Sequence, residues 1–160
     1  GLPLYRIEDI LQRNKVDIPR STMSQWTIKV GELLTPLYNL IQDDLISGNY
    51  IACDETRVQV LKEPGKKATT QSFMWVRGRA GPDPIILYDY DPTRSGDVPD
   101  KLLEGFKGYL QVDGYSGYNK VCRRKDITRV GCMAHIRRKF FDALKGSKYG
   151  KNKAETAIIL

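Results

Sequence analysis

The stretch GYLQVDGYSGYNK, residues 108–120, decides the prediction of the fold. Its first part is rich in apolar residues and is typical of a short buried strand, which ends on a carboxylate, Asp113. A glycine follows at once, and two tyrosines come shortly after it. A charge at the end of a buried strand needs a partner or a role, and the surrounding pattern indicates what Asp113 faces.

Three β-rich stretches precede this strand. They cover residues 50–61, 72–80 and 85–90, and the turn-like segments KEPGKKATT and GPDP separate them. Three strands at such close spacing predict an antiparallel meander.

Strands and helices alternate in the rest of the chain. Residues 95–106 predict a short helix, 108–114 the fourth strand, 115–124 a second short helix, 127–135 the fifth strand and 136–146 a basic amphipathic helix. The order β-β-β-α-β-α-β-α predicts an α/β fold with a mixed sheet. In this order the first and fourth strands can lie side by side and parallel, which would bring Asp54 near Asp113.

The N-terminal part of the chain has a helical period. YRIEDILQRN, residues 5–14, predicts one helix, and a second begins after a short turn, with Ser21 or Thr22 as its cap. Pro36 is expected to kink or restart this second helix. Its apolar residues recur every three or four positions: Met23, Trp26, Val30, Leu33, Leu37, Leu40, Ile41 and Leu45. We interpret Trp26, like Trp75 in the second strand, as a core residue.

The change of period divides the chain into two parts. Residues 1–48 are predicted to form an N-terminal helical segment, in which a plain helical hairpin is a commoner explanation than a DNA-binding helix-turn-helix. Residues 49–160 are predicted to form the α/β core. A last apolar pattern begins at Ala154 and stops at Leu160, so we expect the core to be incomplete at its C-terminus.

Composition limits the class of protein. The chain has 160 residues, 41% hydrophobic and 28% charged, which is typical of a globular domain with its own core. No apolar run reaches the roughly 20 residues that a membrane span needs, and the N-terminus lacks a signal-peptide pattern, so a cytoplasmic location is expected. The three cysteines form no CxxC motif and do not predict a disulfide framework. The formal charge of +7 favours polyanionic partners such as nucleic acid.

Two neighbouring aspartates favour one particular chemistry. Carboxylates a few ångströms apart repel each other, and a divalent cation removes the repulsion. Mg²⁺ prefers oxygen ligands, and a pair of such ions can activate a water and stabilise the leaving oxygen of a phosphodiester. The residues alone leave alternatives open, because Asp113 before a glycine is also a usual turn residue and Asp54 can pair with Arg57.

Four blocks of the sequence, in order, resemble transposases of the insertion sequence 66 family. The blocks are LPLYRIEDILQRNKVDIPRSTMSQW, DETRVQVL, YDYDPTRSGDVPDKLLEGFKGYLQVDGYSGYN and GCMAHIRRKF. The resemblance runs from about residue 2 to residue 145, and the long third block is its most specific part.

The resemblance implies a ribonuclease H-like sheet and a DDE-type active site, in which two aspartates and a glutamate bind two Mg²⁺ ions, with Mn²⁺ as a substitute. By motif, the first aspartate is Asp54 in DET and the second is Asp113 in VDGY. The third acid belongs to a downstream asparagine-rich segment without a counterpart here, so this chain by itself is expected to be catalytically incomplete.

The implied reaction is metal-dependent hydrolysis of a phosphodiester at the end of an insertion element, followed by strand transfer into target DNA. The implied partner is DNA, both at the element ends and at the target. Transposases commonly act as multimers on paired ends, so self-association is compatible with the resemblance, but no residue pattern predicts it.

Cationic residues near the expected site are candidates for DNA contact. Arg137, Arg138 and Lys139 open the last helix, Arg94 lies in a turn, and Lys66 and Lys67 lie at a basic hairpin tip. A run of like charges is usually a solvated face, and contact with phosphate is the alternative interpretation.

Five further residues keep more than one interpretation. Tyr115 and Tyr118 can stack on unpaired bases or pack in the core. Glu55 is expected on the opposite sheet face from Asp54 and is not assigned as a ligand. Cys132 and His135 have the spacing of half a zinc site, but no second pair is near, so no zinc site is predicted and the role of His135 stays unassigned.

Two other functions are compatible with the same residues. A ribonuclease H-like nuclease acting on RNA–DNA hybrids or junctions would share the metal chemistry, and only substrate tests separate it from a transposase. A DNA-binding module without catalysis would use the N-terminal helices and the basic helix, and would bind no metal at Asp54 and Asp113.

Overall fold

A computed structural model describes residues 2–146 of the chain. The helices are α1 (Leu4–Arg13), α2 (Arg20–Ser47), α3 (Asp97–Leu102) and α4 (Met133–Gly146), with 3₁₀ helices η1 (Ser116–Asn119) and η2 (Val121–Arg123). The strands are β1 (Tyr50–Gln59), β2 (Gln71–Arg79), β3 (Ile85–Asp91), β4 (Gly108–Val112) and β5 (Ile127–Gly131). The chain divides into two compact units, Gly1–Gln42 and Asp43–Leu160. No described helix is both long and apolar enough to cross a membrane.

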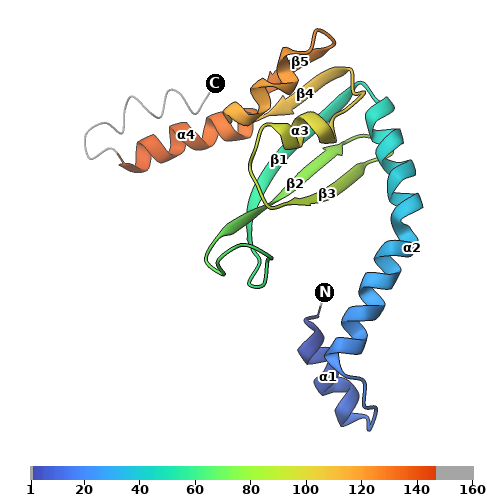
Figure 1. Cartoon of the computed structure of the whole chain (residues 1–160). Helices are drawn as coiled ribbons and strands as arrows, with labels where there is room; N and C mark the ends of the chain where they lie inside the picture. Colours follow the sequence, from blue (N-terminus) through green and yellow to red (C-terminus); the bar gives the residue numbers. More distant parts are fainter. Residues whose placement is uncertain (1, 147–160) are drawn as a thin grey trace. The chain divides into compact units, whose positions relative to one another are not determined.

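The five strands form one mixed sheet in the order β3-β2-β1-β4-β5. Strands β1, β2 and β3 are antiparallel neighbours, as close spacing along the chain predicts. Strand β4 lies parallel to β1, and β5 lies parallel to β4 (Figure 1). The predicted element order and the predicted pairing of the first and fourth strands are therefore confirmed.

One face of this sheet carries the hydrophobic core. Trp75 on β2 is fully buried and meets the ring of Tyr118 edge-on, with the ring centroids 5.9 Å apart. The other large apolar side chains with almost no exposure are Leu45, Ile51, Leu103, Phe106, Leu110, Val112 and Val121. Because α3, η1 and η2 contribute to this layer, burial on this side fixes both the crossover segments and the end of β4.

The opposite face of the sheet is open in the described part of the chain. Ile86, Tyr88 and Tyr90 on β3 and Tyr109 on β4 are exposed, between 46% and 62%. The strand register places Asp54, Val76 and Tyr88 in one row across β1, β2 and β3. Asp54 therefore belongs to this open face.

The N-terminal unit agrees with its prediction only in part. Helix α2 continues through Pro36, so of the two predicted outcomes, a kink or a restart, the restart is excluded. Trp26 is 52% exposed and is not a core residue in this structure, unlike Trp75. Apolar spacing identifies a helix face, but it does not show whether anything packs against that face.

Several elements also differ from their predictions. The helix predicted at 95–106 is Asp97–Leu102, and the strand predicted at 108–114 ends at Val112, so Asp113 lies just past it. The short helix predicted at 115–124 is instead two 3₁₀ helices. In the first of them, Gly117 lies against the ring of Tyr115, and a Cβ atom on residue 117 would be only 2.2 Å from a ring carbon. The fifth strand ends at Gly131, because the chain turns at Cys132 into α4. The helix predicted from Ala154 lies outside the described residues.

Candidate functional site

The two candidate aspartates lie just beyond the pairing of β1 with β4. The last pair in this register is Ala52 on β1 with Gln111 on β4. Asp54 follows Ala52 by two residues on β1, and Asp113 follows Gln111 by two residues, one position past the end of β4. Because the two strands run parallel, both aspartates lie toward the same end of the sheet.

The Asp54 carboxylate is exposed and has two neighbours. Its Oδ1 accepts a hydrogen bond from the backbone N–H of Glu55 at 2.9 Å. Its Oδ2 lies 3.7 Å from Nε2 of His135, which is at the start of α4. The side chain of Asp54 is 56% exposed, so most of its oxygen surface remains open to solvent.

Asp113 lies in the short loop after β4, and hydrogen bonds to both its side chain and its backbone hold it there. Its Oδ1 accepts a hydrogen bond from the backbone N–H of Tyr115 at 2.8 Å, which is an Asx-turn arrangement. Arg129 donates from Nη2 to the carbonyl oxygen of Asp113 at 2.7 Å and from Nη1 to the side chain of Asn119 at 2.9 Å. The interpretation of Asp113 as a turn residue is thus correct as local structure, and it leaves the second carboxylate oxygen available.

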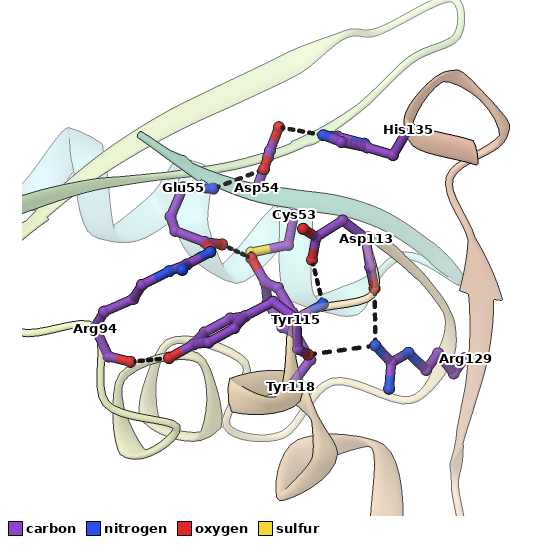
Figure 2. Close-up of polar contacts among 9 residues, drawn as sticks. All are labelled: Cys53, Asp54, Glu55, Arg94, Asp113, Tyr115, Tyr118, Arg129 and His135. Atoms are coloured by element: carbon purple, nitrogen blue, oxygen red, sulfur yellow. Dashed lines mark hydrogen bonds and ion pairs between the residues drawn. The ribbon is translucent and has the colours of Figure 1, made fainter. Parts of the chain in front are cut away.

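Glu55 is the buried centre of a polar cluster on the other side of β1. Its side chain is only 2% exposed. Arg94 forms an ion pair with Oε1, and the Tyr118 hydroxyl donates to Oε2 at 2.6 Å. Figure 2 shows Asp54 and Glu55 leaving the strand on opposite sides, as pleating predicts.

The same cluster reaches the loop of Asp113 through Tyr115. The guanidinium of Arg94 lies 3.8 Å from the centroid of the Tyr115 ring, and the Tyr115 hydroxyl donates to the carbonyl oxygen of Arg94. Burial raises the pKa of Tyr118, so its hydroxyl stays protonated and acts as a donor to Glu55. We infer that the cluster ties β1, the turn at Arg94 and the Asp113 loop into one rigid unit.

Cys132 and His135 form a pair at the beginning of α4. The nearby imidazole of His135, assisted by backbone N–H groups of the first helical turn, lowers the pKa of the Cys132 thiol. The same contact, with the charge of Asp54 as a smaller cause, raises the pKa of His135. His135 therefore lies next to both Asp54 and Cys132, and among the described residues its buried Nδ1 has no hydrogen-bond partner.

A cavity of about 520 Å³ lies beside this pair. It is lined by Val112, Asp113, Gly114, Arg129, Gly131, Cys132, His135, Ile136 and Lys139. Asp54 does not line the cavity, but its carboxylate faces His135, which does. The cavity thus combines an acidic group with cationic side chains from β5 and α4.

The six cationic candidates fall into two groups. Arg137, Arg138 and Lys139 on α4 are exposed, as is Lys67 in the β1–β2 connection. Lys66 is instead tied to the fold by Glu63, Ser72 and the carbonyl oxygen of Pro92. Arg94 is occupied by Glu55 and Tyr115, as described above.

Two hard carboxylates at adjacent strand positions fit a divalent cation in the kind of donor atom they offer. Asp54 and Asp113 are the residues that would hold it. Within residues 2–146, no three His, Cys, Asp or Glu side chains gather closely enough to hold a metal ion together.

Arg129 and Glu55 are the residues near the site whose structural roles the sequence did not reveal. Arg129 is one of many basic residues, and no local pattern distinguishes it from a solvated cation. The sequence carried one indication for Glu55, because strand alternation predicted it on the opposite sheet face from Asp54. That face carries the core, and a buried charge requires partners. The partners are distant in sequence: Arg94 is 39 residues away and Tyr118 is 63 residues away.

The fold and site define an α/β protein with a mixed sheet, in which Asp54 lies on β1 and Asp113 directly follows the parallel neighbour β4. Residues 1–159 match the family model described as Transposase IS66 family, and the chain belongs to this family. The resemblance on which the sequence interpretation rests is thereby confirmed.

Two relatives from Sinorhizobium fredii (strain NBRC 101917 / NGR234) are similar to this chain. The uncharacterized protein y4qI is 36% identical over 155 residues, covering 89% of this chain and 29% of that protein. The uncharacterized protein y4jD is 33% identical over 156 residues, covering 90% of this chain and 30% of that protein. The chain thus spans less than a third of the length of these relatives. No solved structure matches the chain.

Proposed function

We propose that this chain is part of the catalytic region of a DDE-type DNA transposase, with Asp54 and Asp113 as two of its acidic ligands. Membership of the family supports a role in transposition. The observation that supports the catalytic assignment is the parallel β1–β4 pairing, whose last pair, Ala52 with Gln111, lies two residues before the aspartates of the DET and VDGY motifs.

The sheet also supports the fold that the family resemblance implies. A central β1 with an antiparallel meander on one side and two parallel strands on the other agrees with a ribonuclease H-like arrangement. We therefore propose that fold for the core. Its crossover segments pack on the face opposite Asp54, which leaves the aspartates accessible to a large substrate.

The proposed cofactor is Mg²⁺, with Mn²⁺ as a substitute. When bound between carboxylates, such an ion supplies the Lewis acidity that activates water and stabilises the leaving oxygen of a phosphodiester. The chain's own residues hold the carboxylates in place: Arg129 fixes the backbone of Asp113, and the Glu55 cluster anchors β1 beneath Asp54. Such preorganisation is the protein's main contribution to phosphoryl transfer.

The exposed cations of α4 are the proposed contacts to the DNA backbone. Lys139 lines the cavity next to Asp113, and Arg137 and Arg138 extend the positive surface along the same helix. Phosphate neutralisation by such side chains supplies affinity without sequence preference. The sequence of the element ends would be read elsewhere.

Mn²⁺ binding followed by electron paramagnetic resonance tests the assignment of the acidic pair. The chain is expected to bind Mn²⁺ weakly, and Asp54→Asn or Asp113→Asn is expected to weaken binding by about tenfold or more, because each removes a charged ligand. Asp97→Asn, which removes an exposed carboxylate on α3, is the matched control and should leave binding unchanged. Equal binding by the Asp54, Asp113 and Asp97 variants would contradict the proposal.

A cleavage assay distinguishes the two enzymatic interpretations of the site. We expect the longer protein to cut DNA that carries element ends and to leave RNA–DNA hybrids intact. Cleavage of the hybrid in preference to DNA would identify a ribonuclease H-like nuclease instead.

A further inference from the structure

The cavity between the end of β4 and the start of α4 has a lining of two kinds. Its volume of about 520 Å³ lies within the range of pockets that hold small molecules, roughly 300–1,000 Å³. Val112, Gly131 and Ile136 give it an apolar wall. Arg129 and Lys139 give it a cationic wall. A ligand that fits the whole cavity therefore combines an apolar body with an anionic group.

The positive charge of Arg129 is held in place without being neutralised. Its guanidinium donates to the carbonyl oxygen of Asp113 at 2.7 Å and to the side-chain oxygen of Asn119 at 2.9 Å, and both acceptors are uncharged (Figure 2). Within residues 2–146, no carboxylate forms an ion pair with Arg129. A fixed cation whose hydrogen bonds go to neutral acceptors keeps its attraction for an anion.

Lys139 brings a second cation to the same cavity. Its Nζ lies 3.6 Å from the position that a Cβ atom would take on Gly114, so the ammonium group reaches the loop after β4. In the described part of the chain, Lys139 also has no carboxylate partner. Asp113 contributes one negative charge to the described lining, so the two cations leave the cavity with a net positive charge.

Simple ligands would satisfy only one wall of the cavity. An apolar molecule would cover the two cations and strip them of water without pairing them, which is costly. An inorganic anion would leave the apolar wall in contact with water. A nucleotide unit suits both walls, because its base has apolar faces and its phosphate accepts charge-assisted hydrogen bonds.

We propose that this cavity binds one nucleoside monophosphate unit, with its phosphate against Arg129 and Lys139 and its base against the apolar wall. A free nucleotide and an unpaired nucleotide at the end of a DNA strand share this chemistry, and a pocket of this kind takes a base that has left the stack. The choice of a DNA strand as the source rests on the proposed function, whereas the binding of the nucleotide unit does not.

Protection of Cys132 from alkylation tests this proposal. Cys132 lines the cavity and Cys122 does not, so Cys122 is a control within the same protein. In the presence of EDTA, dTMP at about four times its Kd is expected to slow iodoacetamide labelling of Cys132 by about fivefold, in proportion to 1 + [L]/Kd. Labelling of Cys122 should not change. Thymidine lacks the phosphate and inorganic phosphate lacks the base, so each should protect Cys132 less than dTMP does.

Two variants test the two walls, each measured as the ratio of labelling rates without and with dTMP. Lys139→Ala is expected to raise the protecting concentration of dTMP by about tenfold, because a charge-assisted contact to the phosphate is lost. Gly131→Val narrows the cavity and should abolish protection. A Cβ atom on residue 131 lies 3.8 Å from Cδ1 of Ile136, an ordinary contact that the fold accepts. Lys125→Ala removes an exposed cation outside the cavity and is the matched control for Lys139→Ala.

A duplex with a one-nucleotide 3′ overhang distinguishes the two sources of the nucleotide. Stronger protection of Cys132 by this duplex than by its blunt counterpart supports the proposal and assigns the cavity to a strand end. Protection by dTMP with no difference between the duplexes supports it and assigns the cavity to a free nucleotide. No protection by dTMP or by the overhang, or equal protection of wild type and Lys139→Ala, would overturn it. Because EDTA removes divalent cations, this result is independent of the Mn²⁺ test of the acidic pair.

Discussion

At the scale of single residues, Glu55 and Asp54 show how a strand can serve two purposes. Asp54 stays on the open face with 56% of its side chain exposed, whereas Glu55 is buried between Arg94 and Tyr118. A buried carboxylate is tolerable only when its oxygens are paired, and here both are. The stability of the site's scaffold therefore depends on a residue that contributes no ligand.

Replacing Glu55 by alanine is expected to destabilise the fold by about 2–3 kcal/mol, since the variant removes the hydrogen bonds that two partners donate to a charged group. Arg94 is more than a third exposed and can recover water, which limits the destabilisation. Urea unfolding measures the change, and Tyr118→Phe, which removes one hydroxyl, should cost about 1–2 kcal/mol. A destabilisation below 0.5 kcal/mol (roughly the noise for surface changes) in Glu55→Ala would show that the cluster is not structural.

Cys132 is expected to be the most reactive of the three cysteines. Its pKa is lowered by His135, so its thiolate fraction near neutral pH is raised and its alkylation sets in at lower pH than for an ordinary thiol. Burial raises the pKa of Cys53 to about 12, which keeps that thiol protonated and slow to react.

Iodoacetamide labelling followed by peptide mass spectrometry checks this order. Cys132 should be modified several-fold faster (on the order of 3- to 10-fold) than Cys122, whose pKa burial raises. His135→Ala should slow Cys132 toward the rate of an ordinary thiol. An unchanged rate in that variant would show that the imidazole does not activate the sulfur.

At the scale of elements, α4 carries both the cavity wall and the exposed cations. Its first turn places His135 against Asp54, and one turn later Lys139 lines the cavity. Helical spacing of four residues puts these two side chains on one face. The helix therefore brings an imidazole next to Asp54 and a cation to the wall of the cavity.

Replacing Arg137 and Arg138 by alanine together is expected to weaken DNA binding uniformly across sequences. The slope of log K against log[salt] should fall by about two, because each arginine neutralises one phosphate of the DNA backbone. Fluorescence anisotropy with a duplex at several salt concentrations measures this slope. The double variant Arg123→Ala with Lys125→Ala is the control, because it makes the same change in net charge on another segment. An equal change of slope in that variant would show that DNA binding depends on net charge and not on contacts made by α4.

At the scale of the whole molecule, the sheet has one packed face and one open face in the described residues. The packed face buries Trp75 and Tyr118 completely. The open face exposes Tyr88 and Tyr109 and carries Asp54. Sheets with parallel strands usually have both faces covered, so the open face is available for a macromolecular partner or for more of a longer protein.

Substitutions on the two faces are expected to differ in their effect on stability. Trp75→Ala should cost about 3–5 kcal/mol because it leaves a cavity in the core. Tyr88→Ser should cost less than about 1 kcal/mol, since it removes only cross-strand packing on an exposed surface. Urea midpoints of the two variants test the difference, and comparable destabilisation would show that the open face is packed in solution.

The sequence by itself determined the order of strands and helices, the family, and the parallel pairing of β1 with β4. These depend on local periodicity and on connection rules, which act along the chain. The tertiary structure alone decided the partners of Glu55, the contact of His135 with Asp54 and the exposure of Trp26. Each of these depends on which surface lies against which, and spacing along the chain gives the direction of a side chain without identifying what it meets.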